Sequence, residues 1–179
     1  MDFDALKNLP GEKLLDITPI YIDIARKKLG IAVIGPVCDG YVLKDSFENT
    51  IRFGEAAKIV YMIGGTKNDI AMVETIEKSP MYQSHKNFSY EMNRQGNPTY
   101  MYMFNRIMPG DDSGAFHACD LWYVFGTTNR CWRPLGEEDT DLANDVMDNW
   151  ASFFKTGKPK DEKWLPLTEG DTNIHKFEI

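Results

Sequence analysis

KIVYMIGG, residues 58–65, is the stretch that decides the fold of this chain. Its run from Ile59 to Ile63 is continuously apolar and ends in two glycines, the pattern of a strand buried on both faces of a parallel sheet. A second strand is expected at TYMYMFNRI, residues 99–107, which is rich in aromatic side chains. A polar loop follows each strand, and helical patterns lie between and after them. The pattern therefore predicts an α/β protein.

The N-terminal part of the chain is expected to be helical. Residues 1–35 form this predicted lead-in, with one short helix around residues 12–16. A second helix is expected to begin with Thr18 as its N-cap and Pro19 at its first position, since proline is favoured there.

A late helix is expected over residues 139–157, with Asp139 or Thr140 as its cap and Gly157 at its end. Its apolar residues recur every three to four positions, which predicts one buried face. That face is formed by Leu142, Val146, Trp150, Phe153 and Phe154.

We expect residues 1–179 to form a single domain that contains these elements. The first strand with its acid loop covers residues 58–69, and the second strand with its histidine loop covers residues 99–126. Two parallel strands alone leave both edges exposed, so the sheet is expected to be incomplete in this chain. Either further strands lie within residues 30–55, or another chain completes the sheet.

Composition excludes several functional classes. The net charge is −7 and the basic residues are scattered, which argues against nucleic acid or an anionic membrane surface as a partner. The three cysteines, Cys38, Cys119 and Cys131, show neither metal-ligand nor disulfide spacing, so we expect no metal and no cofactor. No apolar run approaches the length of a membrane span, and no signal peptide is recognised, which predicts a cytoplasmic chain.

Two loops carry candidate chemistry. In open α/β sheets functional groups lie in the loops at the carboxyl ends of strands, and here those loops contain Asp69 and His117. An acid followed by a histidine is the end of the serine, acid, histidine order of α/β-hydrolases. The acid would orient the imidazole, which would take the proton of a serine hydroxyl. His85 and His175 lack such context and are expected on the surface, whereas Cys119 is expected to be buried.

Residues 97–126, NPTYMYMFNRIMPGDDSGAFHACDLWYVFG, resemble the histidine region of the type-B carboxylesterases. This family includes para-nitrobenzyl esterases, mammalian carboxylesterases and cholinesterases. The matching features are a G-x-x-H motif at Gly114 and His117, the acid Asp120, and the closing V-F-G at residues 124–126.

Three further segments resemble the same family, in the same order: GPVCDGYVL at residues 35–43, VYMIGGTKNDI at 60–70 and LANDVMDNWASFFKTGKP at 142–159. The resemblance runs from about residue 5 to the C-terminus. It implies the C-terminal portion of an α/β-hydrolase fold, with two late parallel strands and surrounding helices.

Carried over by position, the resemblance implies that His117 is the catalytic base and Asp69 the triad acid. The chain departs from the family at this acid, where the family usually has glutamate. It also has Asn68 in place of the preceding aspartate and Ile70 in place of the following glycine. Ala118 stands where a serine is common. Since aspartate is one methylene shorter than glutamate, the two loops must approach each other more closely.

The G-x-S-x-G turn that presents the nucleophile is absent from this sequence, as is the family's glycine-rich oxyanion segment. The chain therefore resembles the C-terminal third of a carboxylesterase. We expect it to supply the base and the acid to a serine on an upstream segment, to act on a small carboxylic ester when complete, and to have little activity alone. The alternatives are a non-catalytic binding or adhesion module of the same family, or a fragment that self-associates through its open sheet edge.

Overall fold

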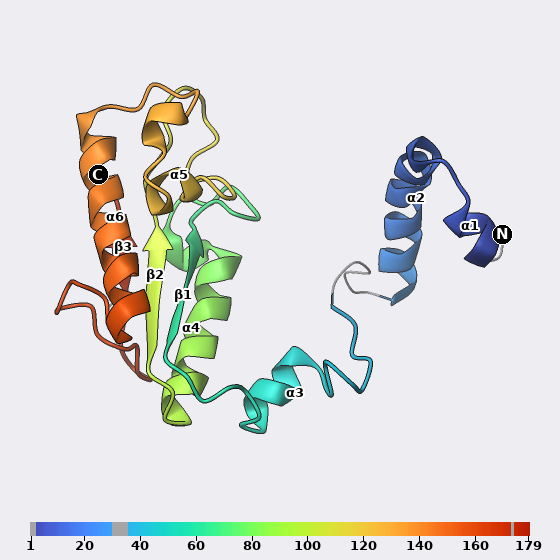
Figure 1. Ribbon diagram of the computed structural model, residues 1–179, viewed down its shortest axis with the longest axis horizontal. Coiled ribbons are helices and arrows are strands. Elements are labelled where there is room, and N and C mark those ends of the chain that lie inside the picture. The colour runs from blue at the N-terminus through green and yellow to red at the C-terminus, as the bar shows by residue number, and fades with distance from the viewer. Residues whose placement is uncertain (1–2, 30–35, 173) are drawn as a thin grey trace. The chain divides into compact units, whose positions relative to one another are not determined.

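The computed structural model describes residues 3–29, 36–172 and 174–179 (Figure 1). These residues divide into two compact units, Met1–Phe47 and Glu48–Ile179, and each is described by itself. Residues 30–35, which end the predicted lead-in and begin the range searched for more strands, lie outside the described residues. The prediction of a single domain over residues 1–179 stays a prediction.

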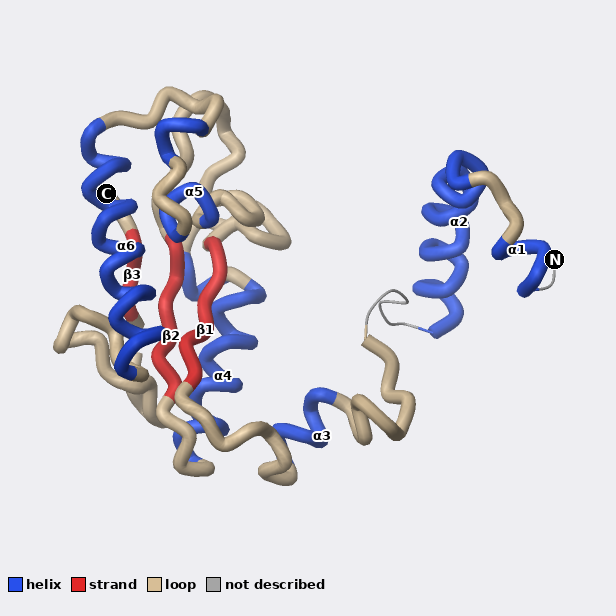
Figure 2. Tube along the Cα trace, viewed as in Figure 1, coloured by secondary structure: helices blue, strands red, loops and turns tan. Residues whose placement is uncertain are grey.

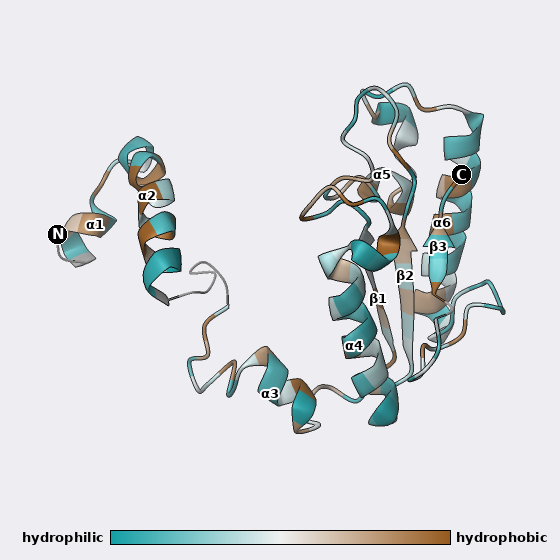
Figure 3. Ribbon diagram, turned by 180° about the vertical axis from the view of Figure 1, so that it is seen from behind, coloured by the Kyte–Doolittle hydropathy of each residue, from teal (hydrophilic) through white to brown (hydrophobic). Residues whose placement is uncertain are grey.

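The described residues up to Leu29 in the first unit form two helices, but the boundary between the helices differs from the prediction. Helix α1 covers Phe3–Lys7 and α2 runs without a break over Gly11–Leu29, so Pro19 lies inside α2. Thr18 does not cap a helix, because its hydroxyl donates to the carbonyl of Leu14 within α2 at 2.6 Å. Several apolar side chains of α2 are exposed, and Figure 3 shows its mixed hydropathy.

The second unit is built on a parallel sheet of three strands in the order β1-β2-β3 (Figure 2). Strand β1 covers Tyr61–Thr66, β2 covers Thr99–Phe104 and β3 covers His175–Phe177. The two predicted strands are confirmed, and they pair in register along their whole length. The third strand was missed, because the C-terminal segment contributes only three residues, of which Phe177 alone is apolar.

The central strand β2 is buried on both faces, as predicted, whereas β1 is not. Among the described residues β1 pairs with β2 alone, so its outer edge is open and its first four residues are only half-buried. Ile59, just before β1, is exposed. The two strands therefore differ in burial although both have continuous apolar sequences.

Helices cover both faces of β2. Helix α4, Pro80–Arg94, packs on one face with the short 3-10 helix η1, Ile76–Lys78, and helix α6, Glu137–Thr156, covers the other. Side chains of β2 alternate between these layers. Tyr100, Tyr102 and Phe104 join a cluster with Leu142, Ala143 and Val146 of α6, and Met101 and Met103 join one with Ile76 and Tyr82.

Helix α6 confirms the predicted late helix but starts two residues earlier, with Gly136 as N-cap. Neither predicted cap residue has that role, since Asp139 lies inside the first turn. Trp150 and Phe153 are partly buried and pack against the core. Phe154 is 73% exposed, so its predicted position on the buried face is wrong. The remaining elements are α3 at Phe47–Arg52, α5 at Leu121–Val124 and η2 at Thr128–Arg130.

Candidate active site

The loops that follow β1 and β2 lie side by side at the carboxyl ends of these strands. Their contact begins at the backbone, where the N–H of Lys67 donates to the carbonyl of Phe104 at 3.0 Å. One residue on, the N–H of Asn68 donates to the carbonyl of Ala115 at 2.9 Å. We call residues 67–75 the acid loop and residues 105–120 the histidine loop. Backbone hydrogen bonding between β1 and β2 therefore continues beyond the strands into the two loops.

These loops bring Asp69 and His117 together. The Nδ1 atom of His117 lies 2.8 Å from Oδ1 of Asp69, although 47 residues separate them in the chain. A hydrogen bond from Nδ1–H to the carboxylate leaves Nε2 as the proton-accepting atom. The His117 side chain is 77% exposed and that of Asp69 17%. The pair therefore presents an oriented imidazole at the surface of this unit.

The chain turns sharply directly after His117. Ala118 has a φ of 64°, the one positive value among the non-glycine residues that the structure describes. This left-handed conformation is strained for alanine. It separates exposed His117 from Cys119, which is fully buried as expected. Burial, with the nearby Asp120 carboxylate, raises the pKa of the Cys119 thiol, which makes it a poor nucleophile.

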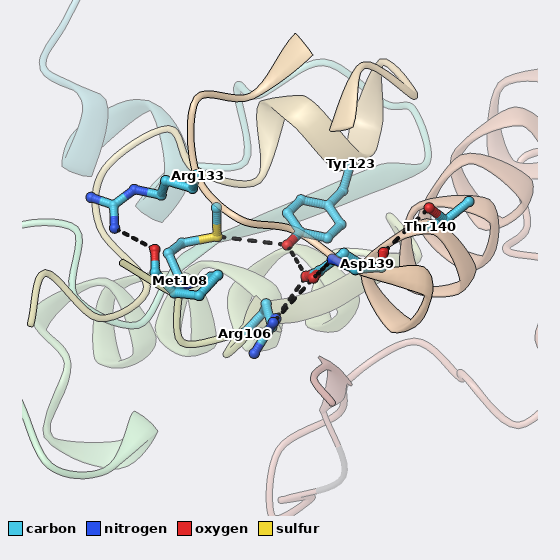
Figure 4. A network of polar contacts seen from close by, with 8 residues as sticks. Arg106, Met108, Tyr123, Arg133, Asp139 and Thr140 are labelled. Carbon is cyan, nitrogen blue, oxygen red and sulfur yellow. Dashed lines mark hydrogen bonds and ion pairs between the residues drawn. The ribbon is translucent and has the colours of Figure 1, made fainter. Parts of the chain in front are cut away.

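A buried polar cluster links the histidine loop to helices α5 and α6 (Figure 4). Arg106, just after β2, donates to both carboxylate oxygens of Asp139, at 2.8 and 3.1 Å. The hydroxyl of Tyr123 on α5 donates to Oδ1 of the same carboxylate at 2.6 Å, and the N–H of Gly136 donates to Oδ2 at 2.9 Å. The Asp139 side chain is 2% exposed. Asp139 thus joins the carboxyl end of β2, α5 and α6.

The hydrogen bonds to Asp139 decide its charge. Burial alone would raise the pKa of this carboxyl, but the hydrogen bonds from Arg106, Tyr123 and Gly136 outweigh burial and hold the pKa below its ordinary value. Asp139 is therefore ionised at neutral pH despite its burial. Sequence reasoning treated Asp139 only as a possible helix cap, and no local pattern identifies its partners.

The outer side of the histidine loop is held by Arg133. Its guanidinium donates to both carboxylate oxygens of Asp111 at 2.9 and 2.7 Å, and to the carbonyl of Pro109 at 2.8 Å. It also lies 4.8 Å from the ring centroid of Phe116, the neighbour of His117. The hydrogen bonds from Arg133 lower the pKa of Asp111. Together with the contacts to Pro109 and Phe116, they hold the histidine loop in place.

Comparisons with known proteins identify the family of this chain. The model of the carboxylesterase family matches residues 70–179, which is more than half of the chain. This chain belongs to the carboxylesterase family. Carboxylesterase 4A of Bos taurus is 29% identical over 116 residues, which cover 55% of this chain and 20% of that protein. The matched residues contain the histidine loop and most of the second unit, and they begin one residue after Asp69.

Solved carboxylesterase structures share the fold of the chain. The carboxylesterase EST55 of Geobacillus stearothermophilus has a TM-score of 0.70 and 22% identity, covering 99% of this chain and 46% of its own. A thermophilic PNB esterase has a TM-score of 0.72 and 20% identity, covering 98% and 46%. The fold is thus the C-terminal portion of an α/β-hydrolase fold. The chain spans slightly less than half the length of these esterases and about a fifth of the curated relative.

Two other histidines differ from expectation. His85 on α4 is 8% exposed, and its ring packs against Gly65 at the end of β1, so the predicted surface position is wrong. Its burial lowers the pKa, partly offset by the charge of Asp69. His175 in β3 is also largely buried, stacked on Trp164 with ring centroids 4.3 Å apart. Both were misjudged because the tertiary neighbours that cover them are distant in sequence.

Within residues 3–29, 36–172 and 174–179, no helix is long and apolar enough to cross a membrane. The same residues contain no group of three or more side chains that could hold a metal ion. No serine among them hydrogen-bonds to His117, whose partner there is Asp69. In this member of the carboxylesterase family, the candidate site therefore consists of the Asp69–His117 pair and the two loops that carry it.

Proposed function

We propose that this chain is the C-terminal segment of a serine carboxylic-ester hydrolase, with His117 as general base and Asp69 as the acid that orients it. The observation that carries this proposal is the 2.8 Å contact between Nδ1 of His117 and Asp69 on an exposed imidazole. The serine and the oxyanion donors come from an upstream segment. Small carboxylic esters are the proposed substrates, in keeping with the family.

The geometry supports the following reaction. The serine hydroxyl gives its proton to Nε2 of His117 while its oxygen attacks the ester carbonyl, and Asp69 stabilises the imidazolium that forms. The tetrahedral intermediate collapses, the carbon–oxygen bond to the alcohol breaks, and His117 protonates the departing alkoxide. Water then repeats these steps on the acyl-serine, which releases the acid and restores the neutral imidazole.

The open edge of β1 is the proposed attachment point of the upstream segment. Among the described residues, β1 pairs on one side only and is half-buried over its first four positions. A parallel strand added at this edge would cover the exposed backbone groups of β1. It would also bring further strand ends to the edge of the sheet that carries the two loops. The chain alone lacks the nucleophile turn, so little turnover is expected from it.

Hydrolysis of para-nitrophenyl butyrate tests this proposal. The 179-residue chain is measured alone and after mixing with the upstream segment of a carboxylesterase that carries the G-x-S-x-G turn. We expect turnover only in the mixture, and a loss of about 10³-fold or more in kcat with His117→Ala. Asp112→Ala is the matched control, since Asp112 is exposed in the same loop, and it should leave turnover unchanged.

Two results would contradict the proposal. Turnover by the chain alone that disappears with His117→Ala would place the nucleophile within these 179 residues. Active mixtures that do not respond to His117→Ala would instead support the non-catalytic module. Sedimentation of the chain alone separates the third possibility, because self-association through the sheet edge gives a mass that rises with concentration.

A further inference from the structure

Asn68 lies between the two loops, and each side-chain polar atom has a backbone partner. Its Oδ1 accepts the N–H of Ala115 in the histidine loop at 3.0 Å. Its Nδ2 donates to the carbonyl of Val73 in the acid loop at 3.1 Å. The backbone N–H of Asn68 donates to the carbonyl of Ala115 at 2.9 Å, and the residue is 7% exposed. The amide therefore closes the acid loop on itself and ties it to the histidine loop.

A glycine of the histidine loop makes room for this amide. Gly114 has a φ of +65°, and a Cβ added there would lie 2.4 Å from Oδ1 of Asn68. No side chain fits at that distance, so the contact requires glycine on steric grounds as well as for its backbone conformation. The Asn68 side chain thus sits in a space defined by the backbone of Gly114 and Ala115.

The position of Asn68 relates it directly to the Asp69–His117 pair. It immediately precedes Asp69, and its partner Ala115 lies two residues before His117. The two hydrogen bonds between Asn68 and Ala115, together with the parallel bridge between Asn68 and Phe116, therefore connect the two loops within two residues of the pair. Because Asp69 has a short side chain, a small separation of the loops would break the 2.8 Å contact.

We propose that Asn68 is a positioning residue, whose carboxamide holds the acid loop against the histidine loop so that Asp69 reaches Nδ1 of His117. This inference rests on the proposed function and deepens it. In this chain the amide accepts from Ala115 and donates to Val73 at the same time, whereas the aspartate that the family usually has here could keep only the first of these hydrogen bonds. A carboxylate can only accept, so it would face the Val73 carbonyl without a donor.

The test measures the hydrogen bond between His117 and Asp69 directly in the 179-residue chain. Neutral histidine in water favours the tautomer with hydrogen on Nε2, whereas a bond from Nδ1–H to Asp69 favours the other tautomer. The imidazole nitrogens of His117 are recorded by ¹⁵N NMR at a pH at which histidine is neutral. We expect a dominant Nδ1–H form in the wild type, and its loss in Asn68→Ala and Asn68→Leu, which both remove the hydrogen bond to Ala115, as in Asp69→Asn.

Asn105→Ala is the matched control. Asn105 follows the end of β2 as Asn68 follows the end of β1. Its amide donates to Glu178 at 2.6 Å and does not join the two loops. We expect this variant to keep the Nδ1–H form of His117. Circular dichroism confirms that each variant is folded. If Asn68→Ala does not fold, the nearly isosteric Asn68→Leu decides the question, since it keeps the side-chain volume and removes the hydrogen bonds to Ala115 and Val73.

A folded Asn68→Leu or Asn68→Ala chain that keeps the wild-type tautomer would overturn the inference. In the mixture that hydrolyses ester, the same variants should lower kcat by about 10- to 100-fold with little change in KM. The two proposals fail separately. If Asn68 variants shift the tautomer but His117→Ala leaves turnover intact, the positioning role stands and the proposed hydrolase function is wrong.

Discussion

Asp139 and Asp69 both lie in the second unit, and they differ in the kind of partner that each carboxylate binds. Asp139 is 2% exposed and receives hydrogen bonds from Arg106, Tyr123 and Gly136. Asp69 holds a single imidazole, His117, which is 77% exposed. The first arrangement connects secondary-structure elements, and the second directs a reactive atom toward solvent. The difference separates a role in stability from a role in chemistry, and it can be measured.

The largest effect is expected from Asp139→Asn. This change removes the charge that balances Arg106 in a buried site, which should lower the free energy of unfolding by about 3 kcal/mol. Urea unfolding at neutral pH measures it. Asp141→Asn is the matched control, since Asp141 is exposed two residues later on the same helix. Equal losses in the two variants would mean that the Asp139 cluster is not a stabilising centre.

The pH dependence of the free energy of unfolding tests the charge of Asp139, and its expected effect is smaller than that of the substitution. The pKa of Asp139 is lowered from its ordinary 3.8, so its contribution is present above that value and is lost as the pH falls through the folded-state pKa. Protonated Asp139 resembles asparagine. The stability difference between wild type and Asp139→Asn should therefore be constant at neutral pH and narrow as the pH falls below about 5 toward the folded-state pKa. A difference that stays constant over this range would contradict an ionised Asp139.

Removing one hydrogen bond from the cluster should cost less again. Tyr123→Phe deletes the hydroxyl that donates to Asp139 at 2.6 Å, and we expect a loss of about 1.5 kcal/mol in the free energy of unfolding. Tyr90→Phe is the control, because its hydroxyl donates to the carbonyl of Asp171 in an exposed setting. If Tyr90→Phe lowers the free energy of unfolding more than Tyr123→Phe does, burial of the hydrogen bond does not determine its contribution to stability.

Much of the fold was readable from sequence because it depends on local pattern. The apolar runs at residues 58–65 and 99–107 became β1 and β2, and the three-to-four periodicity of residues 139–157 became most of α6. Strand β3 was missed because its three residues are defined by pairing with β2, some 70 positions earlier. The unbroken α2 was missed because the local signals of Thr18 and Pro19 suggested a helix start.

The candidate site was readable to a different extent. Loops at the carboxyl ends of strands, together with the family resemblance, led to Asp69 and His117, and the structure brings these residues into contact. Asn68 was noticed only as a departure from the family, since its partners Val73 and Ala115 contribute backbone atoms that no side-chain motif records. The Asp139 cluster was missed for a related reason: its members meet only in the folded chain.

The smallest effect on stability is expected from His117→Ala. With most of its side chain in solvent, His117 loses little buried area, and the free energy of unfolding should change by no more than about 0.5 kcal/mol. His85→Ala is the contrasting control, because His85 is buried against β1 and its removal leaves a cavity. A residue whose removal leaves the fold intact while abolishing ester turnover in the complemented enzyme serves chemistry. If His117→Ala instead destabilises the chain as much as His85→Ala, the Asp69–His117 pair contributes to stability in the way Asp139 does.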